Sequence, residues 1–145
     1  MKIRILFTVA FFIFGMGCEK QENVIPNDPS SPSAPVLSYF NSINAQDSAG
    51  VMNSFGSALR QKTLVNTDTM RGAGIGQLLK NVKGIHYDIK ITDIKIDNTN
   101  PNMAKVYVSE TVSGRISHTV NSIYYSVIKE DGIWKLASSS WEKDK

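Results

Sequence analysis

The apolar residues of the first half of the chain recur at the spacing of amphipathic helices. Two stripes of this kind are Val36, Leu37, Phe40 and Ile43, followed by Val51, Met52, Phe55 and Leu59. Repeats at every third or fourth position predict helices. Pro35 suits a first helical turn, and Asp47 can cap the second helix. A third, short helix is expected to end at Gly84, which gives two to three helices in this half.

The second half alternates apolar and polar residues at every other position, as β-strands do. The runs "IHYDIKI", "AKVYVSETV", 115–129 and "IWKL" predict a meander of four antiparallel strands. The alternation changes phase before Ile94, which predicts a bulge near Thr92 and Asp93. The pairs "SG" at 113–114 and "DG" at 131–132 predict tight hairpins.

Two tight hairpins would set the register of the meander, with Ala104 opposite Ile123 and Val127 opposite Leu136. Opposed residues share a face of a sheet. Beside an apolar set, this register gathers polar residues on the inner face: Glu110, Ser117, Thr119, Asn121, Tyr125, Ser138 and Ser140. Buried polar groups need hydrogen-bond partners. These side chains are therefore expected to line a ligand pocket, or else to lie at the wet mouth of the sheet.

The same register predicts an apolar and aromatic outer face. Its main members are Met103, Tyr107, Val120, Tyr124 and Ile133. Such a surface is unusual if it is solvated. It predicts a homodimer or a protein partner on this face, with a covering helix as the alternative.

The N-terminus predicts a lipid anchor. Lys2 and Arg4 precede the apolar stretch Ile5–Phe14, which is shorter than the roughly 20 residues of a spanning helix. A basic start, a short apolar run and small residues are typical of a secretory signal peptide. Gly17 and Cys18 resemble the lipobox of bacterial lipoproteins, in which cleavage leaves an acylated cysteine at the new N-terminus. Gly15 departs from that pattern, where an aliphatic residue is usual. An ordinary signal peptide with an incidental cysteine is the alternative.

Residues 1–17 are accordingly interpreted as a lipoprotein signal peptide and Cys18 as the palmitate-bearing anchor. Residues 18–33 hold three of the chain's five prolines and predict a flexible tether, with a single domain at 34–145. Glu19, Lys20 and Glu22 resemble surface-export signals of some bacteroidete lipoproteins, but a solvated linker is the favoured explanation. The expected location is the bacterial cell envelope, at the outer membrane or cell surface.

Charge and residue types exclude several classes of function. Without Lys2 and Arg4 the chain has 14 basic and 13 acidic residues, so no basic patch predicts nucleic-acid binding. The two histidines are far apart in the sequence, so we expect no metal site and no cofactor.

The order of elements resembles the nuclear transport factor 2-like superfamily. The stretch "YFNSINAQDSAGVMNSF" looks like that family's first helix, Asp turn and second helix, and "DGIWKL" looks like its penultimate hairpin. The resemblance implies an α+β cone: N-terminal helices packed on a curved antiparallel four-stranded meander. The family includes ketosteroid isomerases and polyketide cyclases beside catalytically silent binding modules. We expect a module that binds a small ligand or a protein partner, with an enzyme or a structural membrane dimer as alternatives. In the enzyme alternative, Glu110 and Tyr125 are the candidate base and oxyanion donor.

Overall fold

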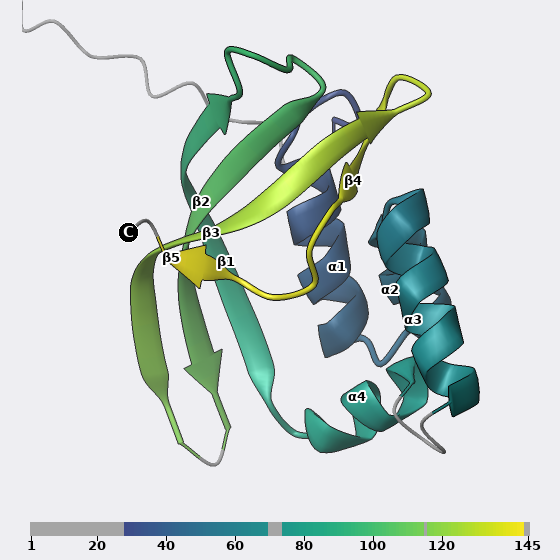
Figure 1. The fold of residues 1–145 in the computed structure, drawn as a ribbon. Coiled ribbons are helices and arrows are strands. Elements are labelled where there is room, and N and C mark those ends of the chain that lie inside the picture. The colour runs from purple at the N-terminus through teal and green to yellow at the C-terminus, as the bar shows by residue number, and fades with distance from the viewer. Residues whose placement is uncertain (1–27, 70–73, 115, 144–145) are drawn as a thin grey trace, which may run out of the picture.

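The computed structural model describes residues 28–69, 74–114 and 116–143 of the chain (Figure 1). In this part of the chain, four helices precede five strands. The helices are α1 (Ala34–Asn44), α2 (Ser48–Ser54), α3 (Ser57–Thr69) and α4 (Ile75–Asn81). The strands are β1 (His86–Ile96), β2 (Met103–Ser113), β3 (His118–Glu130), β4 (Ile133–Leu136) and β5 (Glu142–Lys143). The signal peptide, Cys18 and most of the predicted tether lie outside the described residues.

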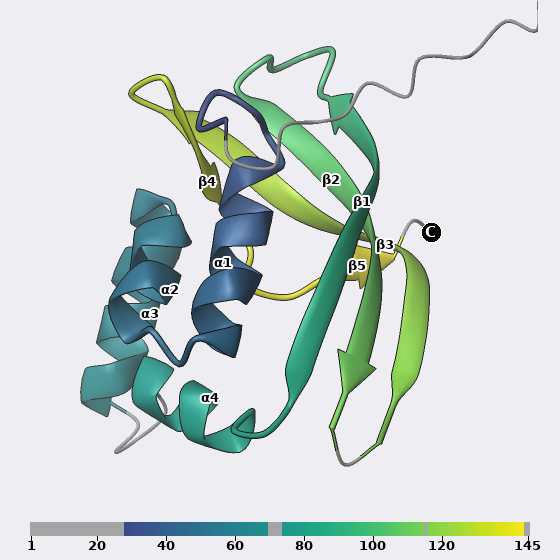
Figure 2. The same cartoon turned by 180° about the vertical axis from the view of Figure 1, so that it is seen from behind.

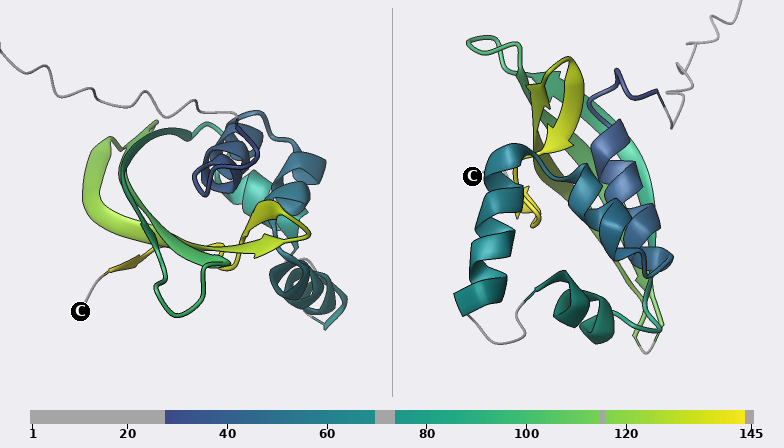
Figure 3. Two further views of the ribbon diagram at one scale, coloured as in Figure 1. Left: turned by 90° about the horizontal axis from the view of Figure 1, so that it is seen from above. Right: turned by 90° about the vertical axis from the view of Figure 1, so that its right-hand side faces the viewer.

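The strands form one curved antiparallel sheet, and α1, α2 and α4 lie on one side of it (Figure 2). The strand order is β1-β2-β3-β4, and the short β5 pairs with β3. Seen from above, the sheet curls around α1, with α2 and α3 farther out (Figure 3). The predicted fold class is therefore confirmed: helices packed on a curved antiparallel meander.

Helix α1 supplies the centre of the core. Its buried apolar residues are Val36, Tyr39, Phe40 and Ile43, so Tyr39 rather than Leu37 completes the predicted stripe. They pack against the inward residues of the sheet, among them the fully buried Val106, Val108, Ile123 and Val127. Ser33, immediately before α1, is also fully buried. The packed region therefore begins at least at this residue, inside the segment 18–33.

The second predicted helix is two helices in the structure. Phe55 is extended and bridges Leu136, and the Gly56 N–H donates to the Leu136 carbonyl oxygen at 2.8 Å. Helix α3 then begins at Ser57, whose N–H donates to both carboxylate oxygens of Glu130 at 3.0 Å. The contact with β4 and the acidic cap from β3 interrupt the helical stripe.

We expect Gly56→Ala to lower the free energy of unfolding by about 1–3 kcal/mol, the usual cost of overpacking. A Cβ at this position would lie 3.0 Å from Glu130 Oε1 and 3.2 Å from the Leu136 carbonyl oxygen. Gly76→Ala in α4 is the control, because its Cβ would meet nothing within 4 Å. Urea unfolding of both variants checks the prediction, and equal stabilities would contradict it.

The register of β2 against β3 differs from the prediction. The loop after Ser113 is longer than a two-residue turn, because β3 begins at His118 and Val112 is opposite that residue. A bulge at Asn121 and Ser122 then shifts the pairing once more, so Ala104 is opposite Val127 and not Ile123. The pairing of Val127 with Leu136 and the bulge between Ile91 and Asp93 are confirmed.

Candidate functional site

Glu110 is a carboxylate inside the core. It lies on β2, its side chain is only 6% exposed, and its Oε2 accepts a hydrogen bond of 3.0 Å from the Tyr125 hydroxyl of β3. The register places Glu110 opposite Val120, which packs at the edge of the same core. The sequence predicted that Glu110 and Tyr125 share a face, and the structure joins them directly.

Aromatic rings from α1 and β1 complete this aromatic cluster around Glu110, which consists of Tyr39, Phe40, Tyr87 and Tyr125. The Phe40 ring centroid lies 5.1 Å from that of Tyr39, 5.4 Å from that of Tyr87 and 5.5 Å from that of Tyr125. The Asn44 amide fixes α1 to β1, because it donates to the Tyr87 carbonyl oxygen at 2.7 Å and accepts from the Tyr87 N–H at 2.9 Å. The cluster is thus built by three separate elements.

Burial governs the titration of these groups. Loss of hydration raises the pKa of Glu110, while the Tyr125 hydrogen bond and the His118 charge act in the opposite direction. Burial, then the charges of Tyr87 and Glu110, raise the pKa of Tyr39 to about 12. Burial and the Glu110 charge also raise the pKa of Tyr125 and of Tyr87. The phenols therefore stay protonated at neutral pH and can donate hydrogen bonds.

A hollow of about 220 Å³ lies beside the cluster, between the helices and the chain after β4. Tyr39 forms part of its wall, together with Phe55, Thr63, Gly74, Ile75, Leu78 and Ser139. The Tyr39 hydroxyl donates to the Ser139 carbonyl oxygen at 3.4 Å. Neither Glu110 nor Tyr125 lines this hollow. A ligand there would meet a phenol and apolar side chains, with the carboxylate behind them.

The other predicted pocket residues lie elsewhere. Thr119 is opposite Thr111, and Asn121 accepts a hydrogen bond from Ser109, so both lie on the outer face of the sheet. The cause is the longer hairpin loop, which turns Val120 inward in their place. Ser138 and Ser140 lie after β4 and line a separate hollow of about 320 Å³ beside α3.

The residues predicted on the outer face also separate. Tyr107 and Tyr124 are opposite each other there, with ring centroids 5.5 Å apart, and Met103 belongs to the same face. Val120 faces inward, whereas Ile133 alternates with the buried Trp134 and stays on the outer side of β4, beside Leu64 in a groove along α3. The two tyrosines are not bare, since Lys95 Nζ lies 4.6 Å from the Tyr107 ring centroid and Lys105 Nζ 4.3 Å from that of Tyr124.

Sequence reasoning did not assign Tyr39 or Tyr87 to the site. By alternation Tyr87 shares a face of β1 with Ile89 and Ile91, and that position is a signal that links it to Glu110. Tyr39 has a weaker signal, because helical spacing alone admits either Leu37 or Tyr39 inside.

Two further features of the described part of the chain concern metals and membranes. No group of three or more His, Cys, Asp or Glu side chains in it is placed to hold a metal ion. None of its helices is long and apolar enough to cross a bilayer.

No protein-family model matches the sequence, and no curated protein matches it. Among solved structures, the chain is similar to RPA3114, a SEC-C motif containing protein from Rhodopseudomonas palustris. The TM-score is 0.58 at 12% identity, over 81% of this chain and 82% of that one. It is also similar to a provisionally named aromatic ring hydroxylase from Novosphingobium aromaticivorans, with a TM-score of 0.53 at 17% identity, over 82% and 90% of the two chains. At these identities the similarity shows a shared fold alone.

Proposed function

We propose that this chain is a lipid-anchored protein of the bacterial cell envelope whose cone-shaped domain binds a ligand without catalysing a reaction. The burial of Glu110 is the observation that supports binding without catalysis. A general base must come within about 3 Å of the proton it removes. Glu110 is instead 6% exposed, and one of its oxygens is occupied by Tyr125.

The neighbouring groups support the same proposal. Three phenols and Phe40 from the chain itself pack around Glu110. Tyr125 donates to Glu110 and so does not offer its proton to a developing oxyanion. This pair holds the core together and leaves binding to the surface of the domain.

The lipid anchor is supported by the sequence from Lys2 to Cys18. We expect the wild-type protein expressed in bacteria to take up labelled palmitate, and Cys18→Ala to lose the label, because the thiol is the only acceptor for the thioether-linked lipid. Ser30→Ala is the control, since this exposed residue lies outside the lipobox. Gel fluorography checks the result, and a label retained by Cys18→Ala would refute the anchor.

Native mass spectrometry of the full chain, extracted from membranes in a sugar-free polyoxyethylene detergent, tests the binding function. We expect a noncovalent adduct whose released ligand is recovered with unchanged mass after incubation with fresh protein. Absence of any adduct, or conversion of the ligand to a product, would contradict a noncatalytic binding module. Conversion would favour the isomerase-like alternative.

A further inference from the structure

The outer face of the sheet, on the side opposite α1, carries a hollow among the described residues. Its volume is about 660 Å³, and it is lined by Thr92, Asp93, Tyr107, Asn121, Ser122 and Lys143. Small-molecule sites usually measure about 300–1,000 Å³. We call this space, with its six lining residues, the outer hollow. None of them belongs to the aromatic cluster around Glu110.

Two β-bulges meet at the outer hollow. The bulge of β1 lies between Ile91 and Asp93, and Asp93 is opposite Tyr107. The bulge of β3 contains Asn121 and Ser122, next to Tyr124, which is opposite Tyr107 on the other side. Bulges re-aim side chains and recur beside functional sites. Here the bulges bring polar residues of β1 and β3 to the same hollow as Tyr107 of β2.

Ser122 adds a backbone feature to the same place. Its φ is +59°, in the left-handed region that serine rarely adopts. Such residues cost free energy and cluster at binding and catalytic sites. The strain therefore lies in the wall of the hollow.

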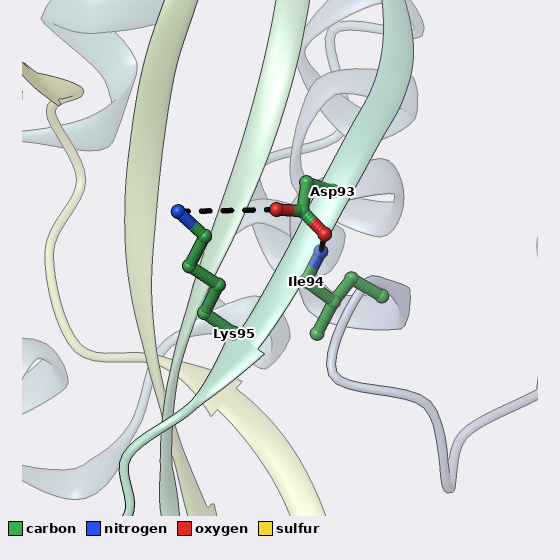
Figure 4. A network of polar contacts seen from close by, with 3 residues as sticks. All are labelled: Asp93, Ile94 and Lys95. Carbon is green, nitrogen blue, oxygen red and sulfur yellow. Dashed lines mark hydrogen bonds and ion pairs between the residues drawn. The ribbon is translucent and has the colours of Figure 1, made fainter.

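Two polar side chains of the hollow, those of Asp93 and Asn121, have polar partners in the structure. Asp93 Oδ1 accepts a hydrogen bond of 2.8 Å from the Ile94 N–H, and Oδ2 lies 4.0 Å from Lys95 Nζ (Figure 4). Asn121 Oδ1 accepts a hydrogen bond of 2.6 Å from Ser109 Oγ. The donor Nδ2 of the same amide therefore points away from Ser109. Fixed donors and acceptors lower the entropy cost of binding a polar ligand.

The Tyr107 ring is in contact with two neighbouring side chains. Lys95 lies over it, and the Tyr124 ring is inclined to it by 47° at 5.5 Å. Tyr124 is fixed in turn by a 2.8 Å hydrogen bond from its hydroxyl to Glu142, next to Lys143 of the hollow. An oriented ring gives a flat apolar platform among hydroxyl, amide, carboxylate and ammonium groups.

We propose that the outer hollow binds an uncharged saccharide, which deepens the proposed ligand-binding function and rests on it. The apolar face of a pyranose ring lies against Tyr107, where it takes the place of the Lys95 ammonium, whose side chain is 60% exposed. Sugar hydroxyls donate to Asp93 and accept from Asn121 and Lys143. The mixed charges favour this class, because Asp93 repels anions such as phosphates and Lys143 repels cations.

The test uses the full chain in the same sugar-free detergent and an array of uncharged oligosaccharides of glucose, mannose, galactose and N-acetylglucosamine. The strongest binder is then titrated by calorimetry. We expect Tyr107→Ala to raise Kd at least about tenfold and Asn121→Ala about fivefold, through loss of the ring contact and one hydrogen bond. Tyr107→Phe, which keeps the ring, should retain binding. Asp93→Ala should weaken it.

Thr111→Ala is the matched control, because Thr111 lies on the same outer face and outside the hollow. Its Kd should equal that of the wild type, and thermal unfolding of each variant separates loss of binding from loss of folding. Absence of binding across the array, or equal affinity of folded Tyr107→Ala, Asn121→Ala and wild type, would overturn the site. Either result leaves the proposed function standing if native mass spectrometry finds another adduct. Chemical conversion of a saccharide by the wild type would instead refute the noncatalytic function and keep the site.

Discussion

Replacement of Phe40 by alanine is expected to lower the free energy of unfolding by about 3–5 kcal/mol, the usual cost of removing a buried phenylalanine. Phe40 is 4% exposed, and its ring meets those of Tyr39, Tyr87 and Tyr125. Contacts between two rings are worth about 0.5–1.5 kcal/mol beyond area burial. The substitution removes three such contacts at once, at the point where α1 joins β1 and β3.

Equilibrium urea unfolding checks this expectation, with Leu64→Ala as the control. Leu64 lies on α3 and is 54% exposed, so its truncation should change stability by no more than about 0.5 kcal/mol. The denaturant slope should stay the same in both variants. A loss below about 1 kcal/mol for Phe40→Ala would show that the aromatic cluster is not the centre of the core.

The local pattern of the sequence predicts those parts of this fold that depend on neighbouring residues. The spacing of Val36, Phe40 and Ile43 identifies the buried side of α1, and the phase change before Ile94 locates the bulge of β1. Each of these elements buries a single face, so the spacing of its apolar residues shows which side is inside. Helices followed by antiparallel strands are predicted by such patterns, whereas the curved cone was implied by the family resemblance.

The register of β3 could not be read in the same way. "SG" at 113–114 resembles a two-residue turn, yet the strand resumes only at His118. The loop and the bulge together displace the pairing by an even number of residues at Ile123, which keeps that residue inside as predicted. Between the loop and the bulge, the pairing of β3 with β2 differs from the predicted one by an odd number of residues, so Thr119 faces outward. A bulge of this kind depends on how the whole sheet curves, which no local signal encodes.

The break between α2 and α3 likewise depends on a distant partner. Phe55 continues the helical stripe by spacing, but its backbone bridges Leu136 of β4. Glu130 then caps α3 from the end of β3. Tertiary contacts override helix propensity here, because the extended Phe55 fills the core and the new helix gains a cap.

The candidate site was likewise predictable only in part from the sequence. The alternation of β2 and β3 puts Glu110 and Tyr125 on one face, and the structure joins them by a hydrogen bond. The sequence cannot tell that α1 closes over them. That depends on the packing angle between the helix and the curved sheet, which brings Tyr39 and Phe40 to the pair.

At pH 8, Glu110→Gln is expected to be more stable than the wild type. Burial raises the pKa of the folded carboxyl above its unfolded value, so the folded state binds the proton more tightly. The stability from this group is fully present below the unfolded pKa, near 4, and is lost as the pH rises through the folded pKa. Glutamine stays neutral throughout and keeps an oxygen to accept from Tyr125. At pH 8 the free energy of unfolding of Glu110→Gln should exceed that of the wild type by about 1.4 kcal/mol for each unit by which folding raises the Glu110 pKa.

Glu110→Ala should act in the opposite direction, because it leaves the buried Tyr125 hydroxyl without its acceptor, at a cost of about 1–3 kcal/mol. Urea unfolding of the three proteins between about pH 4 and pH 9 separates charge from hydrogen bonding. The phenols do not titrate in this range, since the Tyr39 pKa is about 12 and those of Tyr87 and Tyr125 are also raised. Parallel pH profiles for Glu110→Gln and the wild type would show that this carboxylate is not desolvated. The enclosure on which the noncatalytic function rests would then be lost, and Glu110 would again be available as a base.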